Sequence, residues 1–557
     1  MEVELVHLPI HPHPLAPFSI SGFSCLMCFS GLQCRASKDY WCTSCSHPFH
    51  KECAESPLEL NHHPYHPPHP LTLRPLDLDT DEASGVCSCC GDLLGKGWVY
   101  HCIICKFIMH FTCAKKPPVL EVDRPKSHDH KLFLLPKPRP FTCEACGLTP
   151  DGSSLPWGCH QCGAMLHREC FDLPRLVRIS RHQHRLCFAP SPPPPAHDDE
   201  AWSCGVCRKV VDNHYGAYSC IKGCHYVVHS RCATREDVWD GKDLEGEPEE
   251  LEDFLAPFEV IYEKVIHHFS HEHHLKLNED DDRESSDRGQ HCQACALPCR
   301  VHFGNTYRCT HDGCDFIFHE KCANLPRNIW HLIHPHRLKL QKCEIGYILC
   351  DVCYQISCGF IYTCCKEDCS FKIDVACASV SEPFIHNNHP HPLFSTSMST
   401  NDHACWGCRE QSGSRKIMQC IECDFNLCFR CVTLPPKVRY KQDIHHLVLG
   451  GGGGEEAAAI DGGRWWCEIC EGKMDEEKEM YYTCDICCVT VHVHCILGQD
   501  PLMMPGRYLE GSEDAFEIEA SISCCRPFCH KCGSRCPFPI HLKKKDLRFC
   551  SLICLFS

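Results

Sequence analysis

The stretch Cys102-Ile-Ile-Cys105-Lys-Phe-Ile-Met-His110-Phe-Thr-Cys113 holds a cysteine pair, four residues, a histidine, two residues and a closing cysteine. The spacing recurs seven times, with aspartate or cysteine replacing histidine once each, and closes at Cys53, Cys170, Cys232, Cys322, Cys377, Cys431 and Cys495. Disulfides give no reason for a histidine at a fixed place between cysteines, whereas a tetrahedral zinc site takes thiolate and imidazole ligands together. The stretch therefore predicts a string of zinc modules.

Composition agrees with metal binding inside the cell. The 557 residues include 56 cysteines and 43 histidines. The N-terminal residues carry acidic side chains and prolines where a signal peptide would carry a basic and then an apolar region. No stretch approaches the roughly 18 apolar residues of a membrane span. We therefore expect an intracellular protein, in the cytoplasm or nucleus, whose reduced thiols are free to bind metal.

The charge of the chain argues against two classes of partner. The formal net charge is −17 with neutral histidines, and zinc sites with three thiolates would lower it further. Phosphate backbones and anionic lipids require basic surfaces. Nucleic acids and stable binding to membranes are therefore not expected.

The closing cysteines recur with a period mostly in the fifties, which indicates an array of similar units. Acidic stretches at 235–253 and 279–282 interrupt the array, and their low hydrophobicity predicts disordered linkers that separate four modules from four more. With linkers between them, the modules are expected to fold independently. The predicted domains are zinc modules at 7–57, 62–117, 128–174, 182–235, 254–326, 334–379, 389–435 and 443–498, an acidic linker at 236–253, and a C-terminal zinc knuckle at 524–557.

Each module repeats one internal pattern. A His-x-His-x-Leu element, such as that at 128–132, precedes the first cysteine pair, and an aromatic residue such as Tyr100 stands two residues before the second pair. Apolar residues at every second place, as in Phe316-Ile-Phe318, predict short strands. We expect small zinc-stabilised α+β modules in tandem, with two small antiparallel sheets, a short helical turn and little other regular structure. Units of about 50 residues bury too little apolar surface to fold without the metal.

This order of motifs resembles the plant cysteine/histidine-rich family, whose tandem domains are divergent zinc fingers of the phorbol-ester/diacylglycerol (C1) type. The diacylglycerol-binding relative holds two zinc ions in an interleaved pattern. The resemblance therefore implies one site from the first cysteine pair, the histidine and the closing cysteine, and a second site from the second pair and the leading histidines. The relative completes its second site with a cysteine eight residues after the closing one. No module here has that cysteine, so we infer that the second leading histidine replaces it.

The resemblance thus implies about two zinc ions per module. The first sites would be Cys25, Cys28, His50 and Cys53; Cys87, Cys90, His110 and Cys113; Cys143, Cys146, His167 and Cys170; Cys204, Cys207, His229 and Cys232; Cys292, Cys295, His319 and Cys322; Cys350, Cys353, Asp374 and Cys377; Cys405, Cys408, Cys428 and Cys431; Cys467, Cys470, His492 and Cys495. The second sites would be His11, His13, Cys42 and Cys45; His66, His69, Cys102 and Cys105; His128, His130, Cys159 and Cys162; His182, His184, Cys220 and Cys224; His271, His273, Cys309 and Cys314; His334, His336, Cys364 and Cys369; His389, His391, Cys420 and Cys423; Asp443, His445, Cys484 and Cys487.

The tail has the spacing for one more zinc site. Its predicted ligands are Cys529, Cys532, Cys550 and Cys554, with Cys536 as an alternative ligand. Five cysteines outside the pattern are expected to be buried or idle thiols, namely Cys34, Cys187, Cys299, Cys343 and Cys358.

The sequence favours a binding protein over an enzyme. Each predicted zinc is fully ligated by protein, and no catalytic triad order, phosphate-binding loop or His-Glu-x-x-His motif is found. We expect no catalytic residues and no organic cofactor, and a scaffold that binds other proteins in plant signalling or in stress and developmental responses. Two alternatives remain: a disulfide reductase using the Cys-x-x-Cys dithiols, and a diacylglycerol-binding module. The polar loops between cysteine pairs argue against the lipid alternative.

Overall fold

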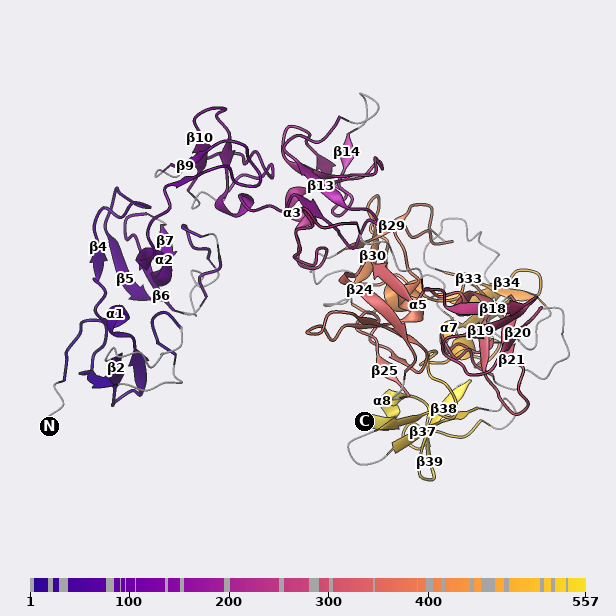
Figure 1. Ribbon diagram of the computed structural model, residues 1–557. Coiled ribbons are helices and arrows are strands. Elements are labelled where there is room, and N and C mark those ends of the chain that lie inside the picture. Colours follow the sequence, from indigo (N-terminus) through magenta and orange to yellow (C-terminus); the bar gives the residue numbers. More distant parts are fainter. Residues whose placement is uncertain are drawn as a thin grey trace. The chain divides into compact units, whose positions relative to one another are not determined.

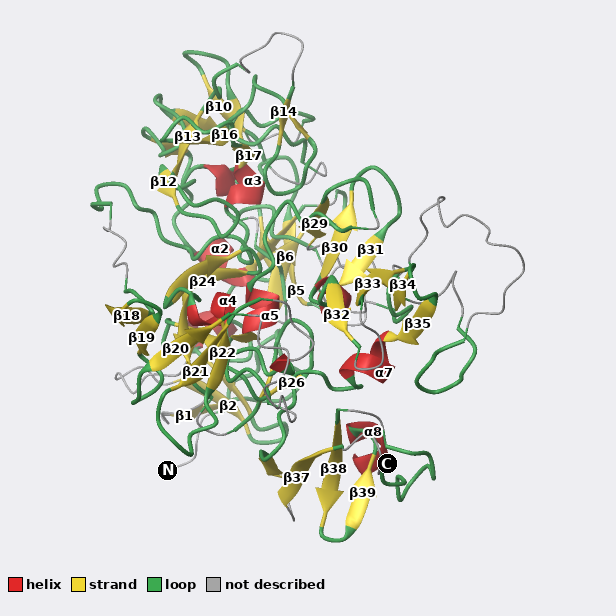
Figure 2. Ribbon diagram, turned by 90° about the vertical axis from the view of Figure 1, so that its right-hand side faces the viewer, coloured by secondary structure: helices red, strands yellow, loops and turns green. Residues whose placement is uncertain are grey.

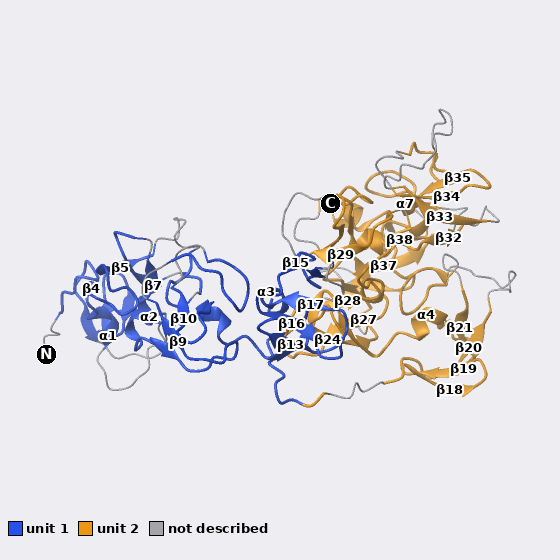
Figure 3. Ribbon diagram, turned by 90° about the horizontal axis from the view of Figure 1, so that it is seen from above, with its two compact units in different colours: residues 1–178, 184–235, 241–247 blue, residues 179–183, 236–240, 248–557 orange. Residues whose placement is uncertain are grey.

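The computed structural model of the chain describes residues 5–18, 24–29, 39–76, 85–90, 92–95, 97–105, 107–135, 139–150, 155–194, 201–249, 255–279, 290–299, 304–343, 346–387, 389–396, 404–411, 416–440, 445–451, 466–474, 480–510, 515–521, 526–536 and 539–556. The chain divides into two compact units (Figure 3). Unit 1 contains Met1–Arg178, His184–Arg235 and Gly241–Glu247, and unit 2 contains Ile179–Gln183, Glu236–Asp240 and Pro248–Ser557. Apart from the short segments Ile179–Gln183 and Glu236–Asp240, the boundary between the units lies between Glu247 and Pro248. It falls within the acidic stretch that the sequence predicts as a linker.

The second module shows how each unit of the repeat is built (Figure 1). Strands β4 (Glu59–Leu60), β5 (Leu71–Pro75), β6 (Trp98–His101) and β7 (Ile108–His110) form an antiparallel sheet in chain order, and helix α2 (Phe111–Lys115) follows directly. The cysteine-containing turn after β6 reverses the chain, so that Tyr100 pairs with Met109. The side chains of both residues are buried, because alternate residues of β6 and β7 face the core.

The other modules repeat this plan with helices of three to five residues (Figure 2). In unit 1 the bounds are β1 Ala16–Phe18, β2 Asp39–Cys42, β3 His47–Phe49 and α1 Lys51–Ala54; β8 Glu121–Val122, β9 Leu132–Leu134, β10 Trp157–Cys159, β11 Met165–Leu166 and η2 Arg168–Cys170; β12 Leu176–Val177, β13 Leu186–Ala189, β14 Trp202–Ser203, β15 Val210–Val211, β16 Ala217–Cys220, β17 Val227–His229 and α3 Ser230–Ala233.

In unit 2 the bounds are β18 Phe258–Tyr262, β19 Val265–His268, β20 Leu275–Asn278, β21 Thr306–Cys309, β22 Ile317–His319 and α4 Glu320–Ala323; β23 Asn328–His331, β24 His334–Gln341, β25 Ile348–Leu349, β26 Ile356–Ser357, β27 Ile361–Cys364, β28 Lys372–Asp374 and α5 Val375–Ala378; β29 Leu393–Thr396, β30 Ile417–Cys420, β31 Asn426–Cys428 and α6 Phe429–Val432; β32 Lys437–Arg439, β33 His446–Gly450, β34 Tyr481–Cys484, β35 Val489–His492 and α7 Val493–Leu497. The tail contains β36 Tyr508–Glu510, β37 Ala515–Ala520, β38 Ile540–Lys544, β39 Leu547–Phe549 and α8 Leu552–Phe556.

A second, smaller antiparallel element accompanies the main sheet. It is the two-stranded sheet β14–β15 in the fourth module and β25–β26 in the sixth. In other modules it shrinks to an isolated bridge around the first cysteine pair, as between Val86 and Leu93. The fold is thus a tandem array of small modules with short antiparallel sheets and little helix, as the sequence predicts.

A tyrosine–proline hydrogen bond links the modules in pairs. The hydroxyl of Tyr100 in the second module donates to the carbonyl of Pro57, which follows the closing cysteine of the first module. The same bond joins the third module to the fourth, the fifth to the sixth and the seventh to the eighth, through Tyr218 and Pro174, Tyr362 and Pro326, and Tyr482 and Pro435 at 2.6–2.8 Å. All four tyrosine side chains are buried, and a buried hydroxyl requires such a partner.

A backbone contact reinforces the pairing. The amide of Phe360 in the sixth module donates to the carbonyl of Ala294, which lies between the first cysteine pair of the fifth module. A Cβ atom on the adjacent Gly359 would lie 2.1 Å from that carbonyl oxygen, so only glycine allows the approach. Gly216 donates to Glu144, and Met480 to Gly407, at the same place in two other pairs. The third, fifth and seventh modules therefore each contact the following module through their own first cysteine knuckle.

The modules share hydrophobic cores, which contradicts the expectation that linkers keep them independent. One cluster runs through the first two modules, from Ile10 to Met109 and beyond, and another joins the fifth to eighth modules, from Ile266 to Leu497. A third cluster packs the tail against the fifth and sixth modules, with Cys358 and Met503 among its residues. The short connections leave apolar residues of neighbouring modules in contact, so that their burial is shared.

The predicted disorder of the acidic stretch is wrong for residues 235–249. Val238 is fully buried, and Trp239 pairs with Ile179. In unit 1, the amide of Leu244 donates to Leu176. These few apolar residues order a segment whose average composition is acidic. Residues 250–254 and 280–289 lie outside the described residues.

We expect Cys113→Ser to unfold the first two modules together, because they share one core. Hydrogen exchange should rise across residues 5–117 and stay unchanged across 176–247, because among the described residues the shared cluster extends into the third module only at Leu134 and Leu155. Cys187→Ser, at an exposed thiol outside the zinc pattern, is the matched control and should change neither region. Exchange confined to residues 66–114 would show instead that the second module folds alone.

Candidate metal centres

The first predicted site of each module forms where a strand meets its helix. In the second module, the ligand atoms of Cys87, Cys90, His110 and Cys113 all lie within 4.8 Å of one another. His110 Nδ1 is 3.4 Å from Cys90 Sγ and 3.8 Å from Cys113 Sγ, and Cys87 Sγ is 4.0 Å from Cys113 Sγ. Tetrahedral zinc with Zn–S of about 2.3 Å and Zn–N of about 2.0 Å would separate its ligands by roughly 3.5–3.8 Å. The cluster therefore has the dimensions of a zinc site.

Backbone groups orient the ligands of this site. The amide of His110 donates to Cys87 Sγ, and His110 Nε2 lies 3.1 Å from the carbonyl oxygen of Leu93. Because a carbonyl only accepts, Nε2 carries a proton, and Nδ1 is the ring atom that faces the sulfur atoms and that a zinc ion would bind. Hydrogen bonding to Cys87, opposed by burial, raises the pKa of His110 to about 9. The space between the ligands thus favours positive charge, which a zinc ion would supply.

The same arrangement recurs at the other first sites. Hydrogen bonding from Cys53, with backbone amides, lowers the pKa of Cys25 to about 4, so a thiolate is favoured. The second cysteine of the pair contacts the ligand of the histidine position at 3.3–3.7 Å in Cys28–His50, Cys146–His167, Cys207–His229, Cys295–His319, Cys353–Asp374, Cys408–Cys428 and Cys470–His492.

The second sites lie at the other end of each sheet, where the turn after the tyrosine strand meets the leading histidines. The structure gathers His11, His13, Cys42 and Cys45; His66, His69, Cys102 and Cys105; and His128, His130, Cys159 and Cys162. A leading histidine contacts a cysteine of the second pair at 3.0–3.6 Å in His13–Cys45, His66–Cys105, His128–Cys162, His184–Cys224, His271–Cys309, His334–Cys369, His389–Cys423 and His445–Cys487. His182 belongs to the segment Ile179–Gln183 of unit 2.

Buried imidazole nitrogens support metal binding at the second sites. Within the described part of the chain, His11 Nε2, His69 Nδ1, His130 Nδ1 and His273 Nδ1 are buried without a hydrogen-bond partner. A buried polar atom without a partner is costly, and coordination of a metal would satisfy it. The wider spacing of His66 and His69 does not prevent both from reaching the cysteine pair. In the seventh module His391 Nε2 contacts Glu422 at 3.2 Å, the kind of carboxylate that orients a zinc-bound histidine.

Asp374 has two roles in the sixth module. Its Oδ1 accepts from the amide of Cys377 at 2.9 Å and caps α5, whereas the histidines at this place make no such cap. Cys353 Sγ lies 3.4 Å from its Oδ2. Burial and the neighbouring Cys350 raise the pKa of Asp374 to about 7. One oxygen is thus committed to the backbone and the other faces the three cysteines.

The tail brings its four predicted ligands together around α8. Cys550 Sγ lies 3.6 Å from Cys532 Sγ and 3.4 Å from Cys554 Sγ, and it also interacts with Cys529. The alternative ligand, Cys536, is fully buried in the apolar cluster of the tail. The tail is larger than the predicted knuckle, because strands β36 and β37 precede residue 524.

Ion pairs occupy the tail sheet in the place of a second cysteine pair. Lys543 Nζ lies 2.6 Å from Glu519 and 3.4 Å from Glu517 on the neighbouring strand. His541 Nε2 also contacts Glu519, at 3.1 Å, and its Nδ1 lies 3.0 Å from Ser521 Oγ. The described residues of the tail thus hold one thiol cluster and one polar network.

The described residues contain seventeen metal-compatible clusters, of which five are those of the first and second modules and the second site of the third. Two sites in each of eight modules and one in the tail would require the same number. Asp443 lies outside the described residues, so its predicted role stays untested.

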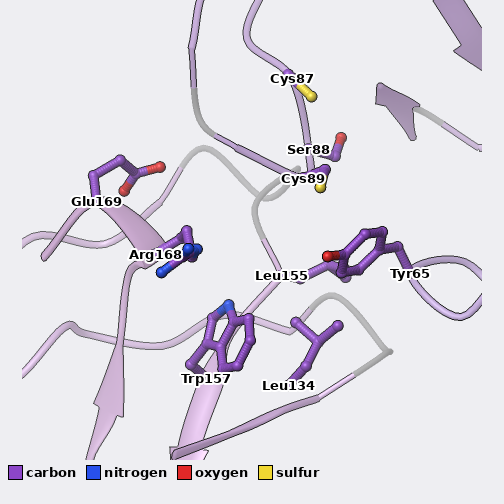
Figure 4. Close-up of a pocket in the computed structure, with 9 residues that line it drawn as sticks. All are labelled: Tyr65, Cys87, Ser88, Cys89, Leu134, Leu155, Trp157, Arg168 and Glu169. Atoms are coloured by element: carbon purple, nitrogen blue, oxygen red, sulfur yellow. The ribbon is translucent and has the colours of Figure 1, made fainter. Parts of the chain in front are cut away.

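The cysteines outside the pattern differ in exposure. Cys299, Cys343 and Cys358 are buried, as expected, whereas Cys187 is exposed and Cys34 lies outside the described residues. Sequence reasoning missed Cys89, which hydrogen-bonds Cys113 and Tyr65. It lines a small pocket together with Tyr65, Leu134, Leu155 and Trp157 (Figure 4). The pocket belongs to the joint between the second and third modules.

Sequence reasoning also missed a buried histidine three residues before the leading pair. His331 Nε2 donates to the carbonyl of Val380 at 3.2 Å, and burial lowers the pKa of His331 to about 4. His63, His268 and His386 occupy the same place and are buried. This neutral histidine ties the leading loop to the end of the helix. The repeated His-x-x-His spacing is the signal that could have found it.

We expect seventeen bound zinc ions in the fully loaded protein. Native mass spectrometry, with and without a chelator, measures this number directly. A count near eight would contradict two sites per module.

The first site of the sixth module should release zinc before the others, since a carboxylate oxygen is a weaker zinc ligand than imidazole. Titration with a competing chelator should show earlier release still in Asp374→Asn, which retains the helix cap, and delayed release in Asp374→His. Asp351→Asn removes a nearby exposed carboxylate and serves as the control. Unchanged release in Asp374→Asn would exclude Asp374 as a ligand.

Family comparisons identify five of the eight modules and the tail. The family model described as "C1 domain" matches residues 64–114, 126–171, 180–233, 269–323 and 442–496, and the one described as "C1 domain-like, C-terminal" matches residues 516–555. No curated protein and no solved structure matched the chain. The matched residues contain the paired clusters of cysteine and histidine described above. The chain is therefore a cysteine/histidine-rich protein of tandem C1 domains that ends in a C1-like domain.

Proposed function

We propose that this protein is a zinc-dependent scaffold that binds other proteins inside plant cells, in the cytoplasm or nucleus, during signalling or stress and developmental responses. The supporting observation is that clusters in the first three modules each offer four protein ligands to one metal ion. A zinc ion with four protein ligands has no open position for a substrate, so its contribution is to hold the fold. The role of the metal is then to fix the relative positions of surface loops.

Exposed apolar side chains on the turns of the second cysteine pairs are suited to binding a protein partner. Isoleucines project from the turns of the second cysteine pairs: Ile103 and Ile104 are 72% and 63% exposed, and Ile486 is 74% exposed. Exposed apolar side chains on rigid turns are typical of interaction sites. Shared cores would hold several such turns in fixed relation within one unit, as a scaffold requires.

The same isoleucines keep a lipid-binding role as a second candidate. Apolar side chains at the tip of a rigid turn can enter the headgroup region of a bilayer. Among the described residues, no helix has the length and apolar character needed to cross a membrane. The net charge of −17 opposes attraction to anionic lipids. A protein partner therefore fits the chain better.

A catalytic role has less support. Zinc-bound thiolates are poor candidates for disulfide exchange, which needs a free thiolate. The cysteine pairs lie on turns between short strands, and a thioredoxin-like site would place its reactive cysteine at a helix N-terminus. We therefore propose that the protein turns over no substrate.

Three assays on the zinc-loaded full-length protein test this proposal. Cross-linking and mass spectrometry in plant extract should identify protein partners that are lost after chelation. Liposomes containing diacylglycerol should not bind the protein saturably, and insulin disulfides should not be reduced. Saturable liposome binding that Ile103→Ser/Ile104→Ser abolishes would favour the lipid role. Catalytic insulin reduction would favour the reductase.

A further inference from the structure

Strand β18 (Phe258–Tyr262) forms one edge of the five-stranded sheet β18-β19-β20-β21-β22. Its inner side pairs with β19, and in the described residues no other strand pairs with its outer side. Figures 2 and 3 show β18 at the rim of unit 2. The backbone N–H and C=O groups on that outer side can pair with an added strand.

The side chains of β18 differ from those of an ordinary protected edge. Val260 is 67% exposed and Tyr262 is 61% exposed, although the residues they pair with, Ile266 and Val265, are buried. Leu255, just before the strand, is 52% exposed. Protected edges are typically short or bulged, or carry charged residues or proline. Strand β18 has a bulge and Glu259, yet its apolar side chains extend beyond the buried core of the sheet and are exposed to solvent.

The charges next to this row are acidic. Glu259 and Glu263 are both exposed. The nearby cation, Lys264, is paired with Glu279 at 2.6 Å. An added strand with basic residues would place its charges opposite these carboxylates, and opposite charges across a strand pair are favourable. A second copy of β18 would instead oppose carboxylate to carboxylate.

A β-bulge further defines the usable edge. The register between β18 and β19 shifts between Val260 and Tyr262, which leaves Ile261 without a paired residue. A bulge bends the strand and increases its local twist. The regular part of the edge is therefore Phe258–Val260, with Tyr262 at its bent end.

We propose that β18 binds an extended segment of a partner protein in which apolar, β-branched residues alternate with lysine or arginine, and that the segment adds a strand to the sheet. This inference rests on the proposed scaffold function and assigns one of its binding surfaces. The backbone hydrogen bonds of the added strand supply affinity, Val260 and Tyr262 supply the apolar contact, and Glu259 and Glu263 select basic residues.

The test uses the zinc-loaded full-length protein and a labelled nine-residue peptide of alternating valine and lysine. Fluorescence anisotropy should show saturable binding. A peptide N-methylated at every second residue should bind at least about tenfold more weakly, because it lacks backbone donors on one edge. A valine–glutamate peptide should bind at least about tenfold more weakly as well, because its charges repel the strand.

Substitutions in β18 test whether the peptide binds at this strand. Val260→Ser/Tyr262→Ser should weaken peptide binding at least about tenfold, and Glu259→Gln/Glu263→Gln should weaken it several-fold. The control is Val210→Ser, at a valine of equal exposure, 67%, in β15. It should leave binding unchanged. Zinc content equal to that of the unaltered protein shows that each variant is folded.

Equal binding of the N-methylated peptide would overturn the proposal, since charge attraction alone would explain it. A dimer in sedimentation equilibrium that Val260→Ser/Tyr262→Ser dissociates would overturn it in favour of a second copy. If zinc-dependent partners are found but the peptide does not bind, only this inference fails. If the peptide binds but no zinc-dependent partner is found, the scaffold proposal fails and the strand-binding surface remains.

Discussion

The paired clusters of cysteine and histidine, each with the dimensions of a zinc site, are the constraint on which the modules depend. Each main sheet has only three to five strands of two to eight residues, which is too little to persist in water by itself. The ligand clusters lie at opposite ends of this sheet. One joins the first cysteine knuckle to the start of the helix, and the other joins the turn after the tyrosine strand to the leading histidines. The interleaved ligands therefore cross-link segments that the backbone alone would leave free.

Pairing of modules is the next level of organisation. The first cysteine knuckle of the third, fifth and seventh modules serves both as part of a ligand cluster and as the surface that receives the next module, as Ala294 receives Phe360. The state of that cluster and the docking of the next module are thus physically coupled. The tyrosine–proline bond adds a second contact from the linker. Shared burial, as between the first two modules, then makes the pair the smallest cooperative element.

The first ligand clusters could be predicted from the local spacing of cysteine and histidine, whereas the second clusters, which join residues as far apart as His13 and Cys45, were implied by the resemblance to C1-type fingers. The knuckles, the strand before the ligand and the short helix are all encoded within about a dozen residues, and the repeated motif gave each of them. The pairing could not be predicted, because Tyr100 and its equivalents have an obvious role inside their own modules. Their hydroxyl partners lie more than thirty residues away, as with Tyr362 and Pro326. Order in the acidic stretch could not be predicted from its average composition. The stretch is ordered by two apolar residues, because Val238 is buried and Trp239 pairs with Ile179.

The tyrosine–proline joint has a consequence for how such a chain can change its length. An odd module presents a proline carbonyl and a knuckle, and an even module presents the tyrosine and a close-packed backbone such as that at Gly359. Loss of one module by recombination would bring together two halves of different joints or leave a buried tyrosine hydroxyl without its acceptor. Loss or gain of two adjacent modules preserves every tyrosine–proline joint. We therefore expect arrays of this kind to gain or lose modules in pairs. Arrays whose length differs by one module should be selected against.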